Sequence, residues 1–259
     1  MTVVALMLSR GGSTGLPGKN VRLLLGRPVM AYPLIAANDS KHVDRVFVST
    51  DSDEIKAVGR QYGAEIIDRP DYLCTPEALG EDAYRHGYHW IKDKLASEGE
   101  EMELICCLFA NSPCITGDLI DQGIERLRTD ETLDSAITAS KLNMWSPLRA
   151  RRLTDEGILQ PFVPFETFGD PATLSCDRDS QGDVWFYDSG VVVARPRALE
   201  HLDEGLLPQK WMGQRIALIP STGGGADIDE EWQLPMVEFW LTEHGIEPAE
   251  AAAAVAERA

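Results

Sequence analysis

The first twenty residues place the strongest constraint on how this chain can fold. An apolar run, residues 3–8, stops at Ser9 and gives way to a loop, residues 11–18, that contains four glycines. A short apolar run bounded by glycines is typical of a buried parallel strand. Glycines let backbone N–H groups close around an anion, because no Cβ blocks the approach. With Arg10 and Lys19 at its two edges, the segment predicts a phosphate-binding loop.

Two familiar phosphate loops do not fit this spacing. A Walker A loop has four residues between its first glycine and the final Gly-Lys-Ser/Thr, whereas five residues separate Gly12 from Gly18-Lys19, and Asn20 replaces the hydroxyl residue. The dinucleotide fingerprint G-x-G-x-x-G also fails, because Gly12, Gly15 and Gly18 are each three residues apart. The loop therefore favours neither a P-loop NTPase nor a nicotinamide enzyme.

Strands and helices alternate through the rest of the N-terminal half. Apolar runs predict strands at residues 3–8, 43–50, 64–67 and 103–110, and helical patterns predict helices at residues 29–40, 51–62, 80–98 and 116–128. Such alternation is typical of a parallel sheet with helices on both faces, which predicts the α/β class. Ligands of these sheets bind beyond the carboxyl ends of the strands. We therefore expect the loops 9–20, 68–73 and 111–116 to meet at one site.

The segment 141–185 interrupts this alternation. Prolines and aromatic residues crowd it, so we expect an excursion that covers the active site, a contact between copies of the chain, or a small core under a long loop. Regular elements are predicted to resume at residues 191–194, 215–219 and 230–244. We expect a single domain over residues 1–259, with residues 246–259 as a loosely attached C-terminal tail.

The charge balance argues against one class of partner. The 259 residues include 42 acidic and 24 basic side chains, a net charge of −18. Nucleic-acid binders present a basic face, so we expect no nucleic acid partner and a small anionic ligand at the cationic N-terminal loop. No apolar run approaches the roughly 20 residues of a membrane span, and there is no signal-peptide pattern. Five cysteines show no metal-binding spacing. We expect a cytoplasmic protein that does not enter a membrane.

A pair of carboxylates lies near the C-terminus. Asp227 and Asp229 flank Ile228, so on an extended segment both carboxylates point the same way. Two such groups beside a phosphate loop would suit Mg²⁺, which prefers hard oxygen ligands. The alternative is an acidic turn exposed to solvent, and the residues alone leave both interpretations open.

Four motifs in register resemble one enzyme family. The stretches SRGGSTGLPGKNVRLLLGRPVMAY, VFVSTDSDEI, YGAEIIDRP and DIDEEWQL occur in this order, and they resemble the cytidylyltransferases that activate acidic sugars. The resemblance is greatest to the acylneuraminate (CMP-sialic acid) synthetases, and the 3-deoxy-manno-octulosonate synthetases are more distant. It implies a Rossmann-like, three-layer α/β/α nucleotidyltransferase domain of GT-A-like type with a mostly parallel sheet. It also implies a homodimer formed through an inserted excursion at residues 141–185.

The resemblance implies transfer of CMP from CTP to a small acidic acceptor, with release of pyrophosphate. It places Arg10 near the triphosphate and Lys19 near the reacting phosphates, with Mg²⁺ on Asp227 and Asp229, and these four are the predicted catalytic residues. Arg69 of the RP motif would contact the cytosine. The predicted nucleotide-binding residues are Leu8, Ser9, Gly11, Gly12, Asn20, Arg69 and Gly80, and the predicted acceptor-binding residues are Asn111 and Ser112.

The acceptor half departs from the family pattern. Thr14 stands where the sialate enzymes have the lysine of S-K-G, so one phosphate-facing cation is missing. Their Q-P-T-S-P-L-R strand end corresponds to residues 109–115, with Phe109 for the glutamine and Ile115 for the arginine, and residues 188–190 replace their N-G. Members of the superfamily also attach CMP to phosphonates, which need fewer sugar-hydroxyl contacts. We favour a phosphonate acceptor, with synthesis of a CMP-nonulosonate or CMP-3-deoxy-octulosonate as the alternative.

Two other functions stay open at this point. A nucleotidyltransferase that uses GTP or another base would keep the loop but change the contacts around Arg69. A non-catalytic nucleotide-binding protein would be compatible with Thr14. Because Lys19, Asp227 and Asp229 are all present, we favour an enzyme.

Overall fold

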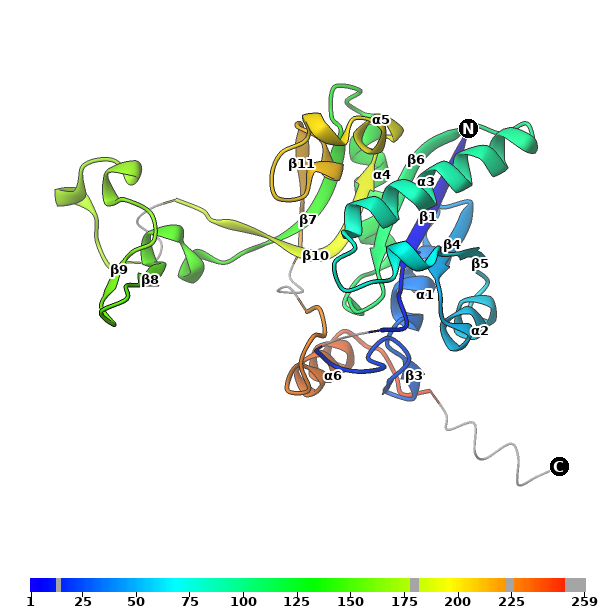
Figure 1. The fold of residues 1–259 in the computed structure, drawn as a ribbon, viewed down its shortest axis with the longest axis horizontal. Helices are drawn as coiled ribbons and strands as arrows, with labels where there is room; N and C mark the ends of the chain where they lie inside the picture. The colour runs from blue at the N-terminus through cyan, green and yellow to red at the C-terminus, as the bar shows by residue number, and fades with distance from the viewer. Residues whose placement is uncertain (13–14, 178–181, 222–225, 250–259) are drawn as a thin grey trace.

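The fold is built on one seven-stranded sheet (Figure 1). The computed structural model describes residues 1–12, 15–177, 182–221 and 226–249. The strands of the sheet are β1 (Thr2–Leu8), β4 (Arg45–Thr50), β5 (Glu65–Asp68), β6 (Met102–Phe109), β7 (Ser135–Lys141), β10 (Trp185–Ala194) and β11 (Ile216–Pro220). They lie in the order β11-β7-β10-β6-β1-β4-β5. β10 is antiparallel to both its neighbours, and every other pairing in this sheet is parallel, so the predicted mostly parallel sheet is confirmed.

Helices cover both faces of the sheet, because its central strands are apolar on both sides. In β1, Val3, Ala5 and Met7 belong to one buried cluster, whereas Val4 and Leu6 belong to the other. The first face carries α1 (Ala31–Asp39), α2 (Asp53–Gln61) and α4 (Gly117–Arg128), and the second carries α3 (Gly80–Ser97) and α5 (Pro196–Glu200). The predicted three-layer α/β/α architecture is confirmed. Across the described ranges, no helix combines the length and the apolar character that crossing a membrane requires.

Strand β7 is absent from the sequence-based prediction. Its side chains Ser135, Thr138 and Ser140 are buried. The Ser135 hydroxyl donates to the Met212 carbonyl, and Thr138 and Ser140 both donate to the carboxylate of Asp188. Buried hydroxyls that find partners elsewhere in the fold take the place of apolar groups, so the strand lacks the hydrophobic pattern by which strands are predicted.

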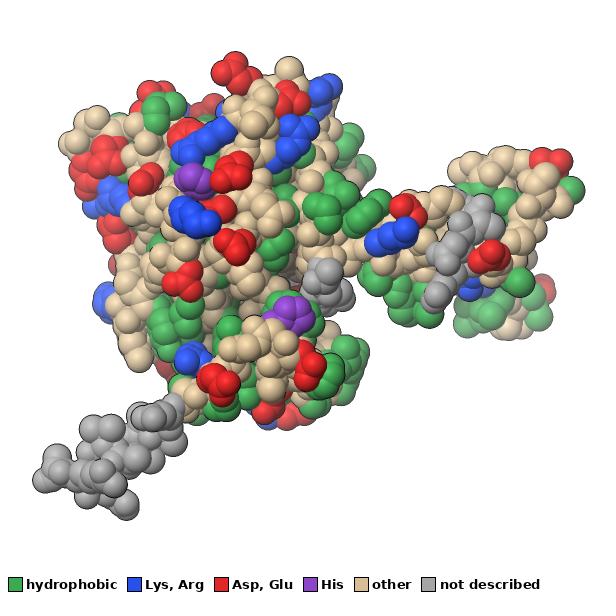
Figure 2. Space-filling view, turned by 180° about the vertical axis from the view of Figure 1, so that it is seen from behind, with side chains coloured by type: hydrophobic (Ala, Val, Ile, Leu, Met, Phe, Trp, Pro, Cys, Tyr) green, Lys and Arg blue, Asp and Glu red, His purple; other side chains and the backbone are tan. Residues whose placement is uncertain are grey.

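The chain leaves the sheet between β7 and β10, and the described residues 142–177 project away from it (Figure 1). This segment, called the excursion below, contains the hairpin β8 (Arg151–Leu153) and β9 (Leu159–Pro161). Hydrophobic side chains gather on its surface (Figure 2), and Trp145, Leu159 and Phe162 are each more than 60% exposed.

A third apolar cluster lies at the carboxyl edge of the sheet. It joins the hairpin β2 (Leu23–Leu24) and β3 (Arg27–Pro28) to the C-terminal helix α6 (Gln233–Glu243). Leu16 from the glycine-rich loop is part of this cluster. So is Ile228, which lies in residues 227–229, called the acidic segment below. After α6, the Ala249 N–H donates to the Leu25 carbonyl (2.9 Å), so residues up to 249 contact the body of the protein. Most of the predicted loose tail, residues 250–259, lies outside the described residues.

Gly117 gives a test of how tightly the first helical layer is packed. A Cβ at this position would lie 2.9 Å from backbone atoms of both Asp39 and Ser40, which cannot move as a side chain could. We predict that Gly117→Ala lowers the free energy of unfolding by about 1–3 kcal/mol, measured by urea denaturation. Gln122→Ala, an exposed site on the same helix, is the control and should change it by less than about 0.5 kcal/mol. Equal midpoints for the two variants would contradict this account of the packing.

Candidate active site

A cavity of about 290 Å³ lies beyond the carboxyl ends of β1, β5 and β6. Residues from all three loops that follow these strands line it. Its lining includes Leu8, Ser9, Arg10, Lys19, Asn20, Arg69, Gly80 and Asn111, all of them predicted site residues. This cavity is called the β1 pocket below. Tyr84 and Phe109 give it an aromatic side.

The glycine-rich loop is fixed from the side of α2. The Gly11 N–H donates to the Asp51 carboxylate (2.8 Å), and a Cβ at Gly11 would lie 3.1 Å from the Cβ of Ser52. Gly11 lines a smaller cavity next to the β1 pocket, whereas Gly12 is exposed and lines neither. Thr14, the predicted departure from the family, lies outside the described residues.

Three cations surround the β1 pocket, and each is held differently. Arg10 donates to the Thr75 carbonyl (2.7 Å). Arg69 is only 7% exposed, and it donates to the backbone carbonyl (2.6 Å) and the hydroxyl (3.2 Å) of Ser49. Burial lowers the pKa of Arg69, but an arginine side chain keeps its charge in proteins. Lys19 forms an ion pair with the Asp229 carboxylate.

Asn20 lines the β1 pocket and carries a buried polar atom without a partner in the described ranges. Its amide nitrogen donates to the Ser9 hydroxyl (2.9 Å), which fixes the orientation of the side chain. Its Oδ1 atom is buried and has no partner among the described residues. A buried polar atom without a partner destabilises a fold, so this position carries a cost that the described contacts do not relieve.

The acidic segment is hydrogen-bonded to Asn111, which follows the end of β6. Ile228 is fully buried, and its N–H donates to the Asn111 carbonyl (2.8 Å). The Asn111 amide in turn contacts the Ile228 carbonyl and the Asp229 carboxylate, each at 3.3 Å. The Gln233 side-chain oxygen accepts the N–H groups of Asp229 and Glu230, both at 2.7 Å. These contacts bring residues 227–229 against Lys19 and the glycine-rich loop.

The two carboxylates of this segment suit a hard divalent cation. The pKa of Asp227 is raised, mainly by burial and then by the negative charge of Asp229. A cation bound between them would offset both effects. No group of three or more His, Cys, Asp or Glu side chains in the described ranges could hold a metal ion by itself. Mg²⁺ commonly takes one or two carboxylates and completes its shell with substrate phosphates and water.

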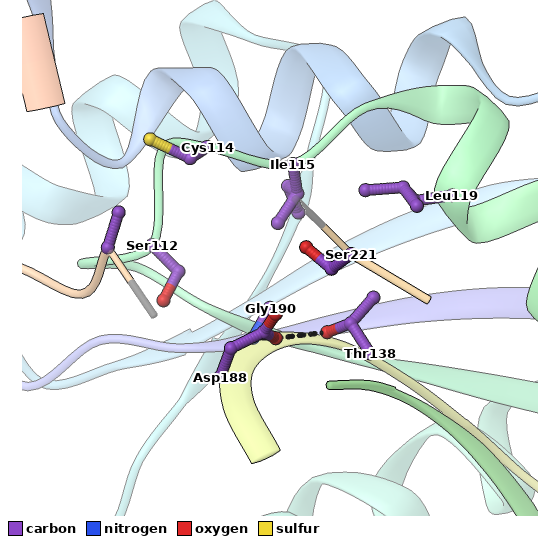
Figure 3. Close-up of a pocket in the computed structure, with 9 residues that line it drawn as sticks. Ser112, Cys114, Ile115, Leu119, Thr138, Asp188, Gly190 and Ser221 are labelled. Atoms are coloured by element: carbon purple, nitrogen blue, oxygen red, sulfur yellow. Dashed lines mark hydrogen bonds between the residues drawn. The ribbon is translucent and has the colours of Figure 1, made fainter. Parts of the chain in front are cut away.

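Ser112 lines a second, much smaller cavity (Figure 3). Its hydroxyl donates to the Ser189 carbonyl (2.6 Å). Ile115 and Thr138 line the same cavity, as does the buried Asp188. The two predicted acceptor-binding residues, Asn111 and Ser112, are therefore neighbours in sequence that line different cavities.

Several residues that support the site are missing from the sequence-based prediction. Asp51 anchors the loop, Ser49 orients Arg69, and Gln233 holds the acidic segment. Asp51 follows directly after β4, and its position at a strand end was the signal that could have identified it. Nothing local distinguishes Gln233 from other polar helix residues.

Comparison with known proteins connects this geometry to a family. A family model described as cytidylyltransferase matches residues 4–155. The N-acylneuraminate cytidylyltransferase of Oncorhynchus mykiss is 34% identical over 232 residues, which cover 89% of this chain and 48% of that protein. The N-acylneuraminate cytidylyltransferase of Escherichia coli O18:K1:H7 is 28% identical over 160 residues, which cover 62% of this chain and 36% of that protein. The chain thus spans about half the length, or less, of these curated relatives.

Solved structures share the fold at low sequence identity. A CMP-2-keto-3-deoxy-manno-octonic acid synthetase complexed with CTP superimposes with a TM-score of 0.66 at 16% identity, covering 94% of this chain and all of that one. A 4-diphosphocytidyl-2C-methyl-D-erythritol synthase from Anaerococcus prevotii gives 0.62 at 14% identity, covering 93% and 96%. The resemblance seen in the four sequence motifs is confirmed, because the match to residues 4–155 spans more than half of the 259 residues: the chain belongs to the cytidylyltransferase family.

Proposed function

We propose that this chain is a Mg²⁺-dependent cytidylyltransferase that transfers CMP from CTP to a small acidic acceptor and releases pyrophosphate. The observation that carries the proposal is the ion pair between Lys19 and Asp229, since it joins Lys19, which lines the β1 pocket, to the acidic segment. Phosphate-binding and metal-binding groups at one point are what transfer of a nucleotidyl group requires.

Different residues would bind different parts of the nucleotide. Arg69, held by Ser49, would contact the cytosine, and Asn20 would lie against the nucleotide in the wall of the β1 pocket. Arg10 and Lys19 would bind the triphosphate, where their charges stabilise the negative charge that develops as pyrophosphate leaves. Asp227 and Asp229 would hold Mg²⁺, which when bound neutralises phosphate charge and orients the reacting oxygens. An acceptor oxygen then bonds to the α-phosphorus as the bond to pyrophosphate breaks.

A phosphonate is the acceptor that we favour. Phe109, which replaces the glutamine of the sialate enzymes, packs edge-on against Tyr84 and Tyr187, with ring centroids 6.0 and 6.3 Å away. Ile115, which replaces their arginine, is 8% exposed. Neither side chain can form a hydrogen bond to a sugar hydroxyl. The second candidate acceptor is a nonulosonic acid, which the names of the curated relatives support.

We propose in addition that the chain is a homodimer through the excursion. Apolar side chains that stand more than 60% exposed, as Leu159 and Phe162 do, are uncommon on a monomer in such number and mark interaction surfaces. The same patch on each copy would form a two-fold contact.

The transfer reaction is tested by pyrophosphate release from CTP and Mg²⁺ with a panel of phosphonates, nonulosonic acids and 3-deoxy-octulosonic acid. We expect turnover with a phosphonate and a loss of about 100-fold or more in kcat for Asp229→Asn, because a charge that stabilises the transition state is removed. Asp203→Asn, an exposed acid elsewhere, is the control. Turnover of a nonulosonic acid alone would reject the phosphonate, and no release with any acceptor would favour a non-catalytic nucleotide-binding protein.

Asp51 gives a separate test of the loop. Asp51→Ala removes the acceptor of the Gly11 N–H, and we expect CTP affinity to fall by about 10-fold, since a hydrogen bond to a charged group contributes about 1.5–3 kcal/mol. Asp53→Ala is the matched control, because Asp53 is 97% exposed two residues further on. Isothermal titration with CTP measures both, and equal dissociation constants would show that Asp51 does not hold the loop. Titration with GTP in parallel checks the choice of base.

Sedimentation equilibrium tests the dimer. We expect the mass of two chains for the unaltered protein, and the mass of one for the double variant Leu159→Asp/Phe162→Asp, because charges placed in an apolar contact are costly to bury. Leu206→Asp, exposed but distant from the excursion in sequence, should remain dimeric. A monomer at micromolar concentration without any substitution would reject the proposal.

A further inference from the structure

Gln233 is the first residue of α6, and its side chain turns back along the chain. Its Oε1 atom accepts the N–H groups of Asp229 and Glu230, both at 2.7 Å, which lie four and three positions before it. A glutamine that reaches back to an earlier N–H forms one half of a capping box, here without the Ser or Thr that starts one. The side chain thus bonds to the backbone of a predicted metal ligand.

Burial does not fix the chain at this point. Ile228 is fully buried and its N–H bonds to Asn111, but the next two residues, Asp229 and Glu230, are exposed. The two bonds to Gln233, and the return bond from the Gln233 N–H to the Glu230 carbonyl (3.1 Å), tie these exposed residues to α6. Hydrogen bonds to one side chain, rather than an apolar contact, therefore set the backbone of Asp229.

The carboxylate of Asp229 uses one of its two oxygens within the protein. Lys19 pairs with Oδ1, and the Asn111 amide contacts the same atom at 3.3 Å. Within the described ranges, Oδ2 has no hydrogen bond or ion pair. A free carboxylate oxygen suits a hard cation, and its direction depends on the backbone that carries the side chain.

The site gives a cation few protein ligands. In the parts of the chain that the structure describes, no group of three or more His, Cys, Asp or Glu side chains could hold a metal ion, so Asp227 and Asp229 would share it with phosphates and water. Two carboxylates bind well only if they are oriented in advance by residues that do not touch the metal. Lys19 and Asn111 support Asp229 at its side chain, and Gln233 supports it at its backbone.

We propose that Gln233 is a positioning residue for the metal: its side-chain oxygen fixes the backbone at Asp229, so that this carboxylate is oriented for the cation that it would share with Asp227. The binding of a metal rests on the proposed function, whereas the fixing of the backbone does not. Residues that orient a metal ligand commonly change metal affinity or activity by about 10- to 100-fold.

Gln233→Met removes the acceptor and keeps an unbranched side chain with a similar helix propensity. In the metal-free protein, we expect the N–H groups of Asp229 and Glu230 to exchange with solvent about 2- to 10-fold faster, because each loses a hydrogen bond; exchange is measured by NMR. We expect the dissociation constant for Mn²⁺, measured by electron paramagnetic resonance without nucleotide, to rise by about 10- to 100-fold.

Two further variants separate positioning from a general effect on α6. Gln233→Glu keeps the shape of the side chain and its acceptor oxygens, so we expect unaltered exchange and a loss of Mn²⁺ affinity below about 10-fold. Glu238→Met places the same new side chain at an exposed position further along α6, and it should change neither quantity.

Unchanged exchange or unchanged Mn²⁺ affinity in Gln233→Met would overturn the inference. So would an equal loss in Glu238→Met or Gln233→Glu, or an unaltered chain that binds no Mn²⁺.

Pyrophosphate release is measured separately. In an active chain, Gln233→Met should lower kcat by about 10- to 100-fold and change KM for CTP by less than a factor of about 2, since the residues of the β1 pocket are untouched. If the unaltered chain releases no pyrophosphate, the proposed function fails, and the exchange and Mn²⁺ measurements still decide whether Gln233 positions Asp229.

Discussion

The site depends on the burial of Ile228. This side chain is fully buried at the carboxyl edge of the sheet, and its N–H bonds to Asn111 at the end of β6. Burying an isoleucine contributes about 1.5–3 kcal/mol, which holds the segment in place. Because side chains alternate along an extended chain, an inward Ile228 leaves Asp227 and Asp229 on the side of the glycine-rich loop, where Lys19 meets Asp229. One apolar contact thus joins two parts of the chain more than 200 residues apart.

Among the described residues, the resulting arrangement pairs only one of its three cations, Lys19, with a carboxylate, and the other two, Arg10 and Arg69, donate to uncharged oxygens. Asp227 is partly buried beside Asp229, and its pKa is raised. Arg10, Lys19 and Arg69 line the β1 pocket, and three cationic side chains therefore face one cavity. A triphosphate with a divalent cation would supply negative charge to the cations and positive charge to the carboxylates. Apart from the Lys19–Asp229 ion pair, the charges at this end of the mostly parallel sheet are therefore arranged for a ligand, as expected where sites are preorganised.

The hydrophobic pattern of the sequence predicted those elements whose buried residues follow one another along the chain. The run before the glycine-rich loop forms β1 because it is buried on both faces, and the Asp-Ile-Asp alternation follows from strand geometry alone. Strand β7 and its contacts with Asp188 could not be predicted in this way, because the buried hydroxyls of Thr138 and Ser140 find their partner in a carboxylate about 50 residues away. Gln233 and Ser49 likewise gain their roles from partners that the fold brings to them. The division of Asn111 and Ser112 between two cavities also depends on side-chain packing that no spacing rule describes.

The central claim is that the glycine-rich loop and the acidic segment form one site for a metal–nucleotide complex. The most direct test is a crystal of the protein soaked with Mn²⁺ and CTP, with diffraction data collected at the manganese absorption edge. The account predicts an anomalous peak between Asp227 and Asp229, with the triphosphate in contact with Lys19 and the cytosine beside Arg69. A nucleotide bound in the β1 pocket with manganese elsewhere, or with no anomalous peak at the two aspartates, would contradict it.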